Sequence, residues 1–416
     1  MKGEFIITKT IFKYIMLIVG IFSVSVLSYS GIISRQFPDS FYVRTGQALE
    51  LGSNITGSDE LTESSDVRAM HDMVQVGEKT VQLRYKGILP IKNVNVEYID
   101  EINLIPCGTA FGVKMETDGV VVVGVGDVDG ENGLVSPAGN AGIKVGDIIM
   151  LVNGIKVREN KDIADIVSAS GGEDVIFSVR RKEMGFELTL KPEKSTVDQT
   201  YKGGLWVRDS SAGIGTMTFY DPATGIFGGL GHPICDVETG DILPLMEGHI
   251  EEVEITGINK GINGIPGELR GVFSKTGSSG ELLLNTESGV FGVLDRNPPQ
   301  NSIMPLGLRQ EVTRGDAVIM CTLGLGEPEE YSIYIESVDI SGANLTKNMV
   351  IHITDPRLLE TTGGIVQGMS GSPIIQGGKI VGAVTHVFVN DPTKGYGIFA
   401  ENMIKTSSKI VIDRAS

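Results

Sequence analysis

Ser370 lies in a short segment whose residue types suit a catalytic nucleophile. Residues 367–373 read Gln-Gly-Met-Ser-Gly-Ser-Pro. Glycines at 368 and 371 allow turn conformations that other residues avoid, so the hydroxyl can project while neighbouring N–H groups converge on one point. The N–H groups of Gly368 and Ser370 are therefore the predicted donors of an oxyanion hole. Taken alone, the segment fits a simple Gly/Ser turn between strands equally well.

A serine hydroxyl needs a base that takes its proton, and the chain has five histidines. His232 is the predicted base, because it follows an apolar run in the glycine-rich turn Gly-Gly-Leu-Gly-His-Pro-Ile, where an imidazole can face a cleft. The alternative is a loop histidine bonded to backbone. The remaining histidines lie in a polar N-terminal stretch or in and beside alternating strands: His71, His249, His352 and His386.

The third catalytic group should be a carboxylate that fixes the tautomer of the imidazole. Asp355 is the predicted residue, because an apolar alternating strand ends there at an Asp-Pro pair. Asp339 and Asp391 are the second choices, and turn formation or helix capping is the alternative role for Asp355. With these residues the chain order is His, Asp, Ser, as in chymotrypsin-like enzymes.

The serine segment also excludes one enzyme class. It lacks the last glycine of the G-x-S-x-G elbow of α/β-hydrolases and is closer to G-D-S-G-G-P. Met369 stands where the trypsin group has the aspartate that accepts a freed amino terminus. Activation by that ion pair is therefore not expected here.

Composition predicts a mainly β protein. The chain has 416 residues, 41% of them hydrophobic, with 55 glycines between short Val/Ile/Thr-rich runs, which favours two or three domains built from strands. A net charge of −17 without a basic stripe argues against nucleic-acid binding. The three cysteines, Cys107, Cys235 and Cys321, have no CxxC spacing, so we expect no disulfide framework and no zinc site. A redox or metal role for Cys235, three residues after His232, is a minor alternative, and we expect no metal and no cofactor.

The N-terminal residues predict a membrane anchor. Tyr14 to Ser34 is an uncharged, apolar stretch long enough to cross a bilayer, and three lysines precede it. The positive-inside rule then leaves residues 1–35 as a cytoplasmic stub and anchor and places the rest outside the cytoplasm. A cleaved signal ending near Ser28 to Ser30 is the alternative. Residues 36–104 are predicted to be a polar tether, to about Val74, followed by a small β region.

Residues 105–195 resemble a PDZ domain. The segments that carry the resemblance run from Cys107 to Val113, from Ser136 to Ile149 and from Val152 to Val157. The resemblance implies that a peptide carboxylate binds the loop formed by Gly108, Thr109, Ala110, Phe111 and Gly112, beside a helix over 160–168. An apparent insertion over 126–137 leaves open whether the ligand is a C-terminus or an internal segment of the same chain.

Residues 200–416 are predicted to form a chymotrypsin-like pair of β-barrels, because short β-like runs recur to the C-terminus. This part, with most of the chain before it, resembles the SpoIVB (stage IV sporulation protein B) family of serine peptidases. The resemblance is carried by residues 206–216, 231–233, 354–355, 363–375 and 385–392. The catalytic residues of the family fall on His232, Asp355 and Ser370.

The resemblance implies a self-cleaving serine endopeptidase, exported into the space between the forespore and mother-cell membranes. Its partners would be the membrane, its own chain and a membrane-bound regulator of an intramembrane protease, whose release activates a late sigma factor. Self-cleavage is expected between the anchor and the PDZ domain. Two alternatives remain: a non-catalytic PDZ scaffold with a peptidase-like domain, and an esterase of small acyl substrates.

Overall fold

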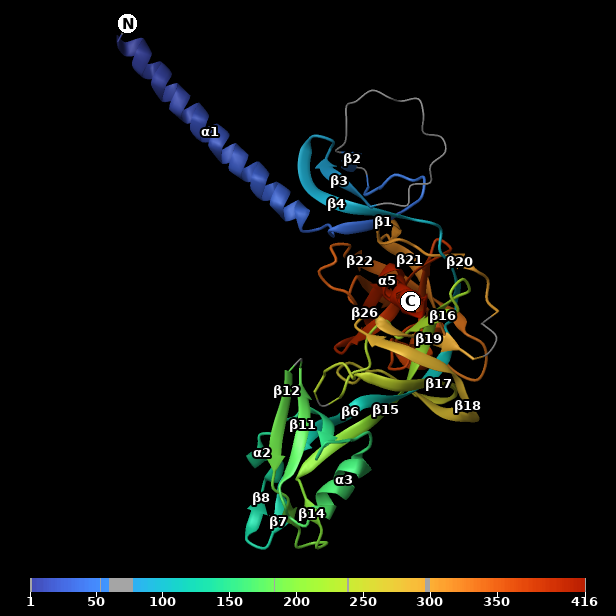
Figure 1. Cartoon of the computed structure of the whole chain (residues 1–416). Coiled ribbons are helices and arrows are strands. Elements are labelled where there is room, and N and C mark those ends of the chain that lie inside the picture. Colours follow the sequence, from blue (N-terminus) through green and yellow to red (C-terminus); the bar gives the residue numbers. More distant parts are fainter. Residues whose placement is uncertain are drawn as a thin grey trace.

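The computed structural model describes residues 2–52, 54–59, 78–182, 184–237, 239–295 and 300–415. Figure 1 shows a long N-terminal helix, a small sheet, a central body of strands and a lobe at the end opposite the helix. The predicted fold class is confirmed: strands dominate, and one apolar helix stands at the N-terminus. His71 and most of the second half of the predicted tether, residues 60–74, lie outside the described residues.

Helix α1 (Lys2–Ser34) leads into a four-stranded sheet. Its segment Tyr14–Ser34 is long and apolar enough to cross a membrane, which is also true of signal sequences. The sheet has the order β1 (Ser40–Arg44), β4 (Leu89–Ile99), β3 (Glu78–Tyr85), β2 (Ile55–Asp59). Ile33 and Phe37 are buried in its core, so the end of α1 is fixed to the sheet by apolar packing. Strands β1 and β2 therefore lie within the stretch predicted to be a tether.

The first half of the central body is a ring of six strands. Its order is β6 (Ala110–Val125), β17 (Leu245–Asn259), β18 (Glu268–Thr286), β19 (Gly289–Leu294), β16 (Ile226–Gly229) and β15 (Leu205–Asp221). Pairing of β15 with β6 closes the ring, which leaves these strands without a free edge there. Two short strands, β5 (Asn103–Pro106) and β20 (Met304–Pro305), continue the sheet from β15.

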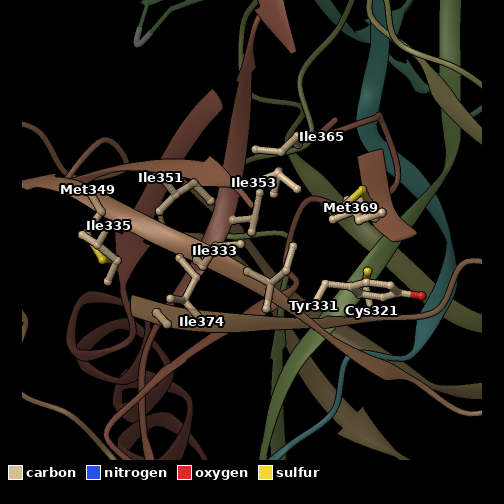
Figure 2. Packing of buried hydrophobic residues seen from close by; sticks show 14 of the residues in the cluster. Cys321, Tyr331, Ile333, Ile335, Met349, Ile351, Ile353, Ile365, Met369 and Ile374 are labelled. Carbon is tan, nitrogen blue, oxygen red and sulfur yellow. The ribbon is translucent and has the colours of Figure 1, made fainter. Parts of the chain in front are cut away.

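The second half is a closed barrel of β21 (Gly315–Cys321), β22 (Glu329–Val338), β23 (Met349–Ile353), β26 (Asp391–Phe399), β25 (Lys379–Phe388) and β24 (Pro373–Gln376). Isoleucines that alternate along β22 and β23 fill its core (Figure 2). Gly377 and Gly378, both at positive φ, form the two-residue turn between β24 and β25. The 3-10 helix η1 (Arg309–Glu311) precedes the barrel, and the final helix α5 (Ala400–Ala415) packs against β25 and β26. A pair of barrels is present as predicted, but the first ring also includes β6, which lies before the predicted bounds of 200–416.

The PDZ lobe includes the C-terminal part of β6 and the N-terminal part of β15, which pair with each other. Strands β9 (Ile148–Val152), β11 (Val175–Arg181) and β12 (Met184–Leu190) extend the sheet from β6, with β10 (Ile155–Lys156) paired to β9. Helices α2 (Pro137–Ala141) and α3 (Asn160–Ala169) pack on it, which confirms the predicted helix over 160–168. The lobe also holds two small hairpins, β7 (Val128–Gly130) with β8 (Gly133–Val135), and β13 (Glu193–Lys194) with β14 (Tyr201–Lys202).

The loop predicted to hold a peptide carboxylate lies elsewhere. Gly108 donates its N–H to the Met217 carbonyl, Thr109 accepts from the Met217 N–H, and Ala110, Phe111 and Gly112 pair with β15 inside the first ring. The groove beside α3 is instead bordered by residues 200–207, with Gly203 and Leu205 opposite Ile163. Both stretches place a glycine before an apolar strand, so sequence pattern alone did not distinguish them.

One ion pair of the PDZ lobe should contribute to stability. The Asp147 carboxylate is fully buried and lies 2.6 Å from Arg181 Nε. We predict that Arg181→Leu lowers the free energy of unfolding by about 2 kcal/mol, because it leaves a buried carboxylate without its cation while the arginine itself is partly screened by water. Lys202→Leu, which removes the solvent-exposed pair with Asp198, should leave chemical denaturation nearly unchanged. Equal effects of the two variants would contradict the prediction.

Candidate active site

The two predicted catalytic side chains from different barrels line one cleft. Its volume is about 560 Å³. His232 belongs to the turn that follows β16 in the first ring, and Ser370 belongs to the loop between α4 (Pro356–Thr362) and β24 of the second barrel. The other lining residues are mostly apolar, among them Ile214, Leu230, Ile234, Val366, Val387 and Val389.

The backbone around Ser370 has the conformation that its glycines predict. Gly368 and Gly371 have φ of +98° and +96°. The fully buried Met369 side chain points into the core of the second barrel (Figure 2) and anchors the loop. Within the described residues, the N–H groups of Gly368 and Ser370 donate no hydrogen bond. Two neighbouring donors are thus available beside the Ser370 hydroxyl, as an oxyanion hole requires.

The Ser370 hydroxyl and the His232 ring are each bonded to backbone. Ser370 Oγ donates to the Thr385 carbonyl at 2.8 Å, and His232 Nδ1 lies 2.8 Å from the Pro233 carbonyl oxygen. Since a carbonyl can only accept, Nδ1 carries the proton and Nε2 is left as the base. The described contacts include no hydrogen bond between Ser370 and His232, so a transfer of the hydroxyl proton to the imidazole would require the hydroxyl to leave Thr385 first.

The electrostatic surroundings favour a neutral imidazole. Burial lowers the pKa of His232 below the ordinary value of 6.5, and the hydrogen bond to Pro233 counters part of this effect. The His386 ring lies 5.1 Å from that of His232, centroid to centroid. Its partial burial, together with His232 and Lys347, lowers the pKa of His386 to about 4. No carboxylate is found among the described residues that line the cleft.

Asp355 is the predicted site residue that the structure does not bring to the cleft. It caps α4, accepting from the Arg357 N–H at 2.9 Å and the Ser332 N–H at 3.2 Å. Its carboxylate also pairs with the Arg357 guanidinium at 3.0 Å, which is the main reason that the pKa of Asp355 falls to about 2. Its contacts are therefore those of a helix cap, which was the alternative role, because an Asp-Pro pair that ends a strand can also begin a helix.

The second-choice carboxylates have local partners as well. Asp339 accepts from the Ser341 N–H, and Asp391 accepts from Thr393. In the described part of the chain, the Pro233 carbonyl is the group that His232 Nδ1 contacts. Sequence reasoning missed this carbonyl and the neighbouring Thr385 and His386. The sequence signal that could have indicated them is the Thr-His pair at 385–386, in the second strand after the serine segment.

Comparisons with known proteins agree with this architecture. The family model "SpoIVB peptidase S55" matches residues 199–404, and the model "PDZ domain" matches residues 135–181. These matches support a serine peptidase with a PDZ domain.

Individual relatives are more distant. A Lactococcus lactis protein described as a candidate zinc metalloprotease, LL2128, is 33% identical over 92 residues, which are 22% of this chain and 20% of that protein. The chain thus spans about a fifth of this relative. The PDZ domain of the SdrC-like protein from Listeria monocytogenes is 19% identical, with 22% and 87% of the two chains covered and a TM-score of 0.18. The HtrA-type protease AlgW with a decapeptide is 14% identical, with 50% and 54% covered and a TM-score of 0.30.

The first prediction from this site concerns the pKa of His232. In an NMR titration of the full chain, we expect His232 to titrate with a midpoint below 6.5, because burial disfavours its charged form. The imidazole should therefore stay neutral, and able to accept a proton, at all pH values above that midpoint. A short unstructured peptide containing His232 provides the reference, and a midpoint above that of the peptide would contradict the prediction.

The second prediction separates the two roles of Asp355. If it is a helix cap, Asp355→Ala lowers the free energy of unfolding by about 1 kcal/mol and leaves the rate at which a fluorophosphonate labels Ser370 within about tenfold of the wild type. If it orients His232, the labelling rate falls by about 10⁴. Asp339→Ala, which removes a comparable turn contact, is the matched control.

Proposed function

Because residues 199–404 belong to the SpoIVB peptidase S55 family and a PDZ domain precedes them, we propose that the chain is a serine endopeptidase with Ser370 as nucleophile and His232 as base. One observation carries the proposal. The two side chains come from different barrels and line the same cleft, where the N–H groups of Gly368 and Ser370 have no partner among the described residues.

In the proposed reaction, His232 Nε2 removes the proton as Ser370 Oγ attacks a peptide carbonyl. The N–H groups of Gly368 and Ser370 stabilise the oxyanion that forms. His232 then gives the proton to the leaving amine, and the acyl-enzyme is hydrolysed by water in the reverse sequence. The Pro233 carbonyl takes the orienting role, since it holds the Nδ1 proton and so fixes the tautomer.

The shape of the chain supports a membrane-associated substrate. The cleft lining is mostly apolar, which favours extended segments with apolar side chains. Helix α1 has the length of a membrane span, and its end is fixed to the first sheet, where Ser30 Oγ donates to the Pro90 carbonyl. An anchored, exported peptidase would thus have its cleft within reach of proteins in the same membrane. The stretch between α1 and the PDZ lobe is the proposed place of self-cleavage.

The resemblance to SpoIVB proteins supports the finer proposal. That proposal is a role in sporulation signalling, in the space between the forespore and mother-cell membranes. There the substrates would be a membrane-bound regulator of an intramembrane protease and the chain itself, and cleavage would lead to late sigma-factor activation.

A non-catalytic scaffold is the second candidate. It is favoured by the groove beside α3, about 400 Å³ in volume, and by the Ser370 hydroxyl being bonded to Thr385 instead of His232. In that case the PDZ lobe would bind partners and the cleft would be inert.

Replacement of the nucleophile tests the proposal. Purified wild-type chain should cleave itself and a peptide library and should react with a fluorophosphonate at Ser370. In Ser370→Ala the rate of cleavage should fall by a factor of at least about 10³, because the acyl-enzyme is proposed to form on the hydroxyl that is removed.

The exposed Ser408→Ala serves as the matched control and should behave as the wild type. Thermal unfolding verifies that the variants are folded, and mass spectrometry of the fragments locates the cut bonds. Undiminished processing by Ser370→Ala would contradict the proposal. Hydrolysis of esters without hydrolysis of peptides would indicate an esterase.

A further inference from the structure

A buried hydroxyl fixes the peptide unit that carries the Ser370 N–H. This unit joins Met369 to Ser370, and its carbonyl accepts from Ser372 Oγ at 2.7 Å and from the Ser372 N–H at 3.0 Å. In a planar trans peptide the C=O and N–H bonds point in opposite directions. Ser372 is completely buried, so its hydroxyl holds the carbonyl inward and leaves the N–H of Ser370 directed away, at the side of the cleft.

The adjacent peptide units are tied to the first ring by strand β15. Thr216 Oγ1 donates to the Gly368 carbonyl at 2.7 Å, and the Thr216 N–H donates to the Ser370 carbonyl at 2.9 Å. Thr218 Oγ1 donates to the Gly371 carbonyl, also at 2.7 Å. Both threonines are buried. The carbonyls of residues 368–371 therefore all accept from buried residues that are not among those lining the cleft.

Such bonds are needed because Gly368 and Gly371, both at positive φ, border the peptide units on either side of the Met369–Ser370 unit, and glycine permits other orientations of those neighbouring units at low cost. If the unit between Met369 and Ser370 turned over, a carbonyl would stand where the oxyanion develops. The site would lose a donor and gain a repulsive dipole. Turning over would also leave the buried Ser372 hydroxyl without its acceptor, which disfavours the change.

We propose that Ser372 and Thr216 are positioning residues of the peptidase reaction. Neither hydroxyl is placed to contact substrate, and each acts through the backbone of the serine loop. The inference rests on the proposed function, because it concerns the stabilisation of an oxyanion formed at Ser370.

The test compares hydroxyl deletions in the full chain. In Ser372→Ala and Thr216→Val we expect kcat for a cleaved peptide to fall by about 10 to 100-fold. Complete loss of one oxyanion donor lowers kcat by about 10² to 10³-fold, and a donor that is only misdirected should lower it by less. KM should stay within about twofold, because the loss concerns the transition state. A peptide boronate should bind more weakly by the same factor as kcat/KM. Thr216→Ser keeps the hydroxyl and should restore kcat to within about threefold.

Thr117→Val is the matched control. Thr117 is buried and its hydroxyl bonds to the carbonyls of Gly119, at 2.6 Å, and Asp209, at 3.1 Å, neither of which belongs to the serine loop. It should lose stability in the same way and keep its kcat. If the three deletions change kcat equally, or if Ser372→Ala retains wild-type kcat, the inference is overturned.

A crystal structure of Ser372→Ala separates this inference from the proposed function. An inactive wild-type chain would contradict the proposed function. The orientation of the Met369–Ser370 peptide unit, in contrast, is read from the crystal structure and does not depend on activity. A carbonyl of Met369 displaced from its wild-type position supports the positioning role. A loop that superposes on the wild type overturns it, whatever the activity.

Discussion

The close approach of Gly371 to strand β15 is the contact on which the cleft depends. A Cβ at this position would lie 1.9 Å from the Thr216 carbonyl oxygen and 2.5 Å from the Leu230 nitrogen. Leu230 in turn donates its N–H to Thr216 and precedes the turn that carries His232. The serine loop, the turn that carries His232 and β15 therefore meet at one point where only glycine fits. Any larger residue would separate the two barrels and, with them, the two side chains proposed to be catalytic.

Local signals in the sequence predicted the parts of the structure that depend on neighbouring residues. The glycine pair at 377 and 378 specifies its hairpin, and the apolar face of 160–168 specifies its helix. Ser370 and His232 could be selected because glycines surround both. The role of Asp355 could not be decided in this way, because an Asp-Pro pair at the end of a strand suits a helix cap and a catalytic carboxylate equally well. The loop at 108–112 was misplaced for a similar reason, because which glycine faces α3 depends on the pairing of distant strands.

The surroundings of His232 differ from those of a triad with a carboxylate. A carbonyl dipole at Nδ1 fixes the tautomer but stabilises the imidazolium less than a full negative charge would. Burial further disfavours the charged ring. In the proposed reaction, more of the stabilisation of the transition state must then come from the oxyanion donors. The peptide unit of the Ser370 N–H is held by the buried Ser372 hydroxyl, and that of the Gly368 N–H by the bond from the Leu269 N–H to the Gln367 carbonyl. A larger share for the oxyanion donors fits a peptidase whose serine loop has the buried Met369 where the trypsin group has an aspartate.

Strand β15 passes from the groove beside α3, at Leu205, to the serine loop, at Thr216, with β-bulges after Trp206 and after Arg208. At roughly 3.3 Å per residue, the length of the strand between these two points is about 36 Å at most. The linings of the two sites come closer than this along the strand, since Val207 belongs to the groove and Ser211 to the cleft. A single extended chain bound in both sites would therefore need no more than on the order of a dozen residues between them, which sets an upper limit on the spacing of the two segments that such a chain presents.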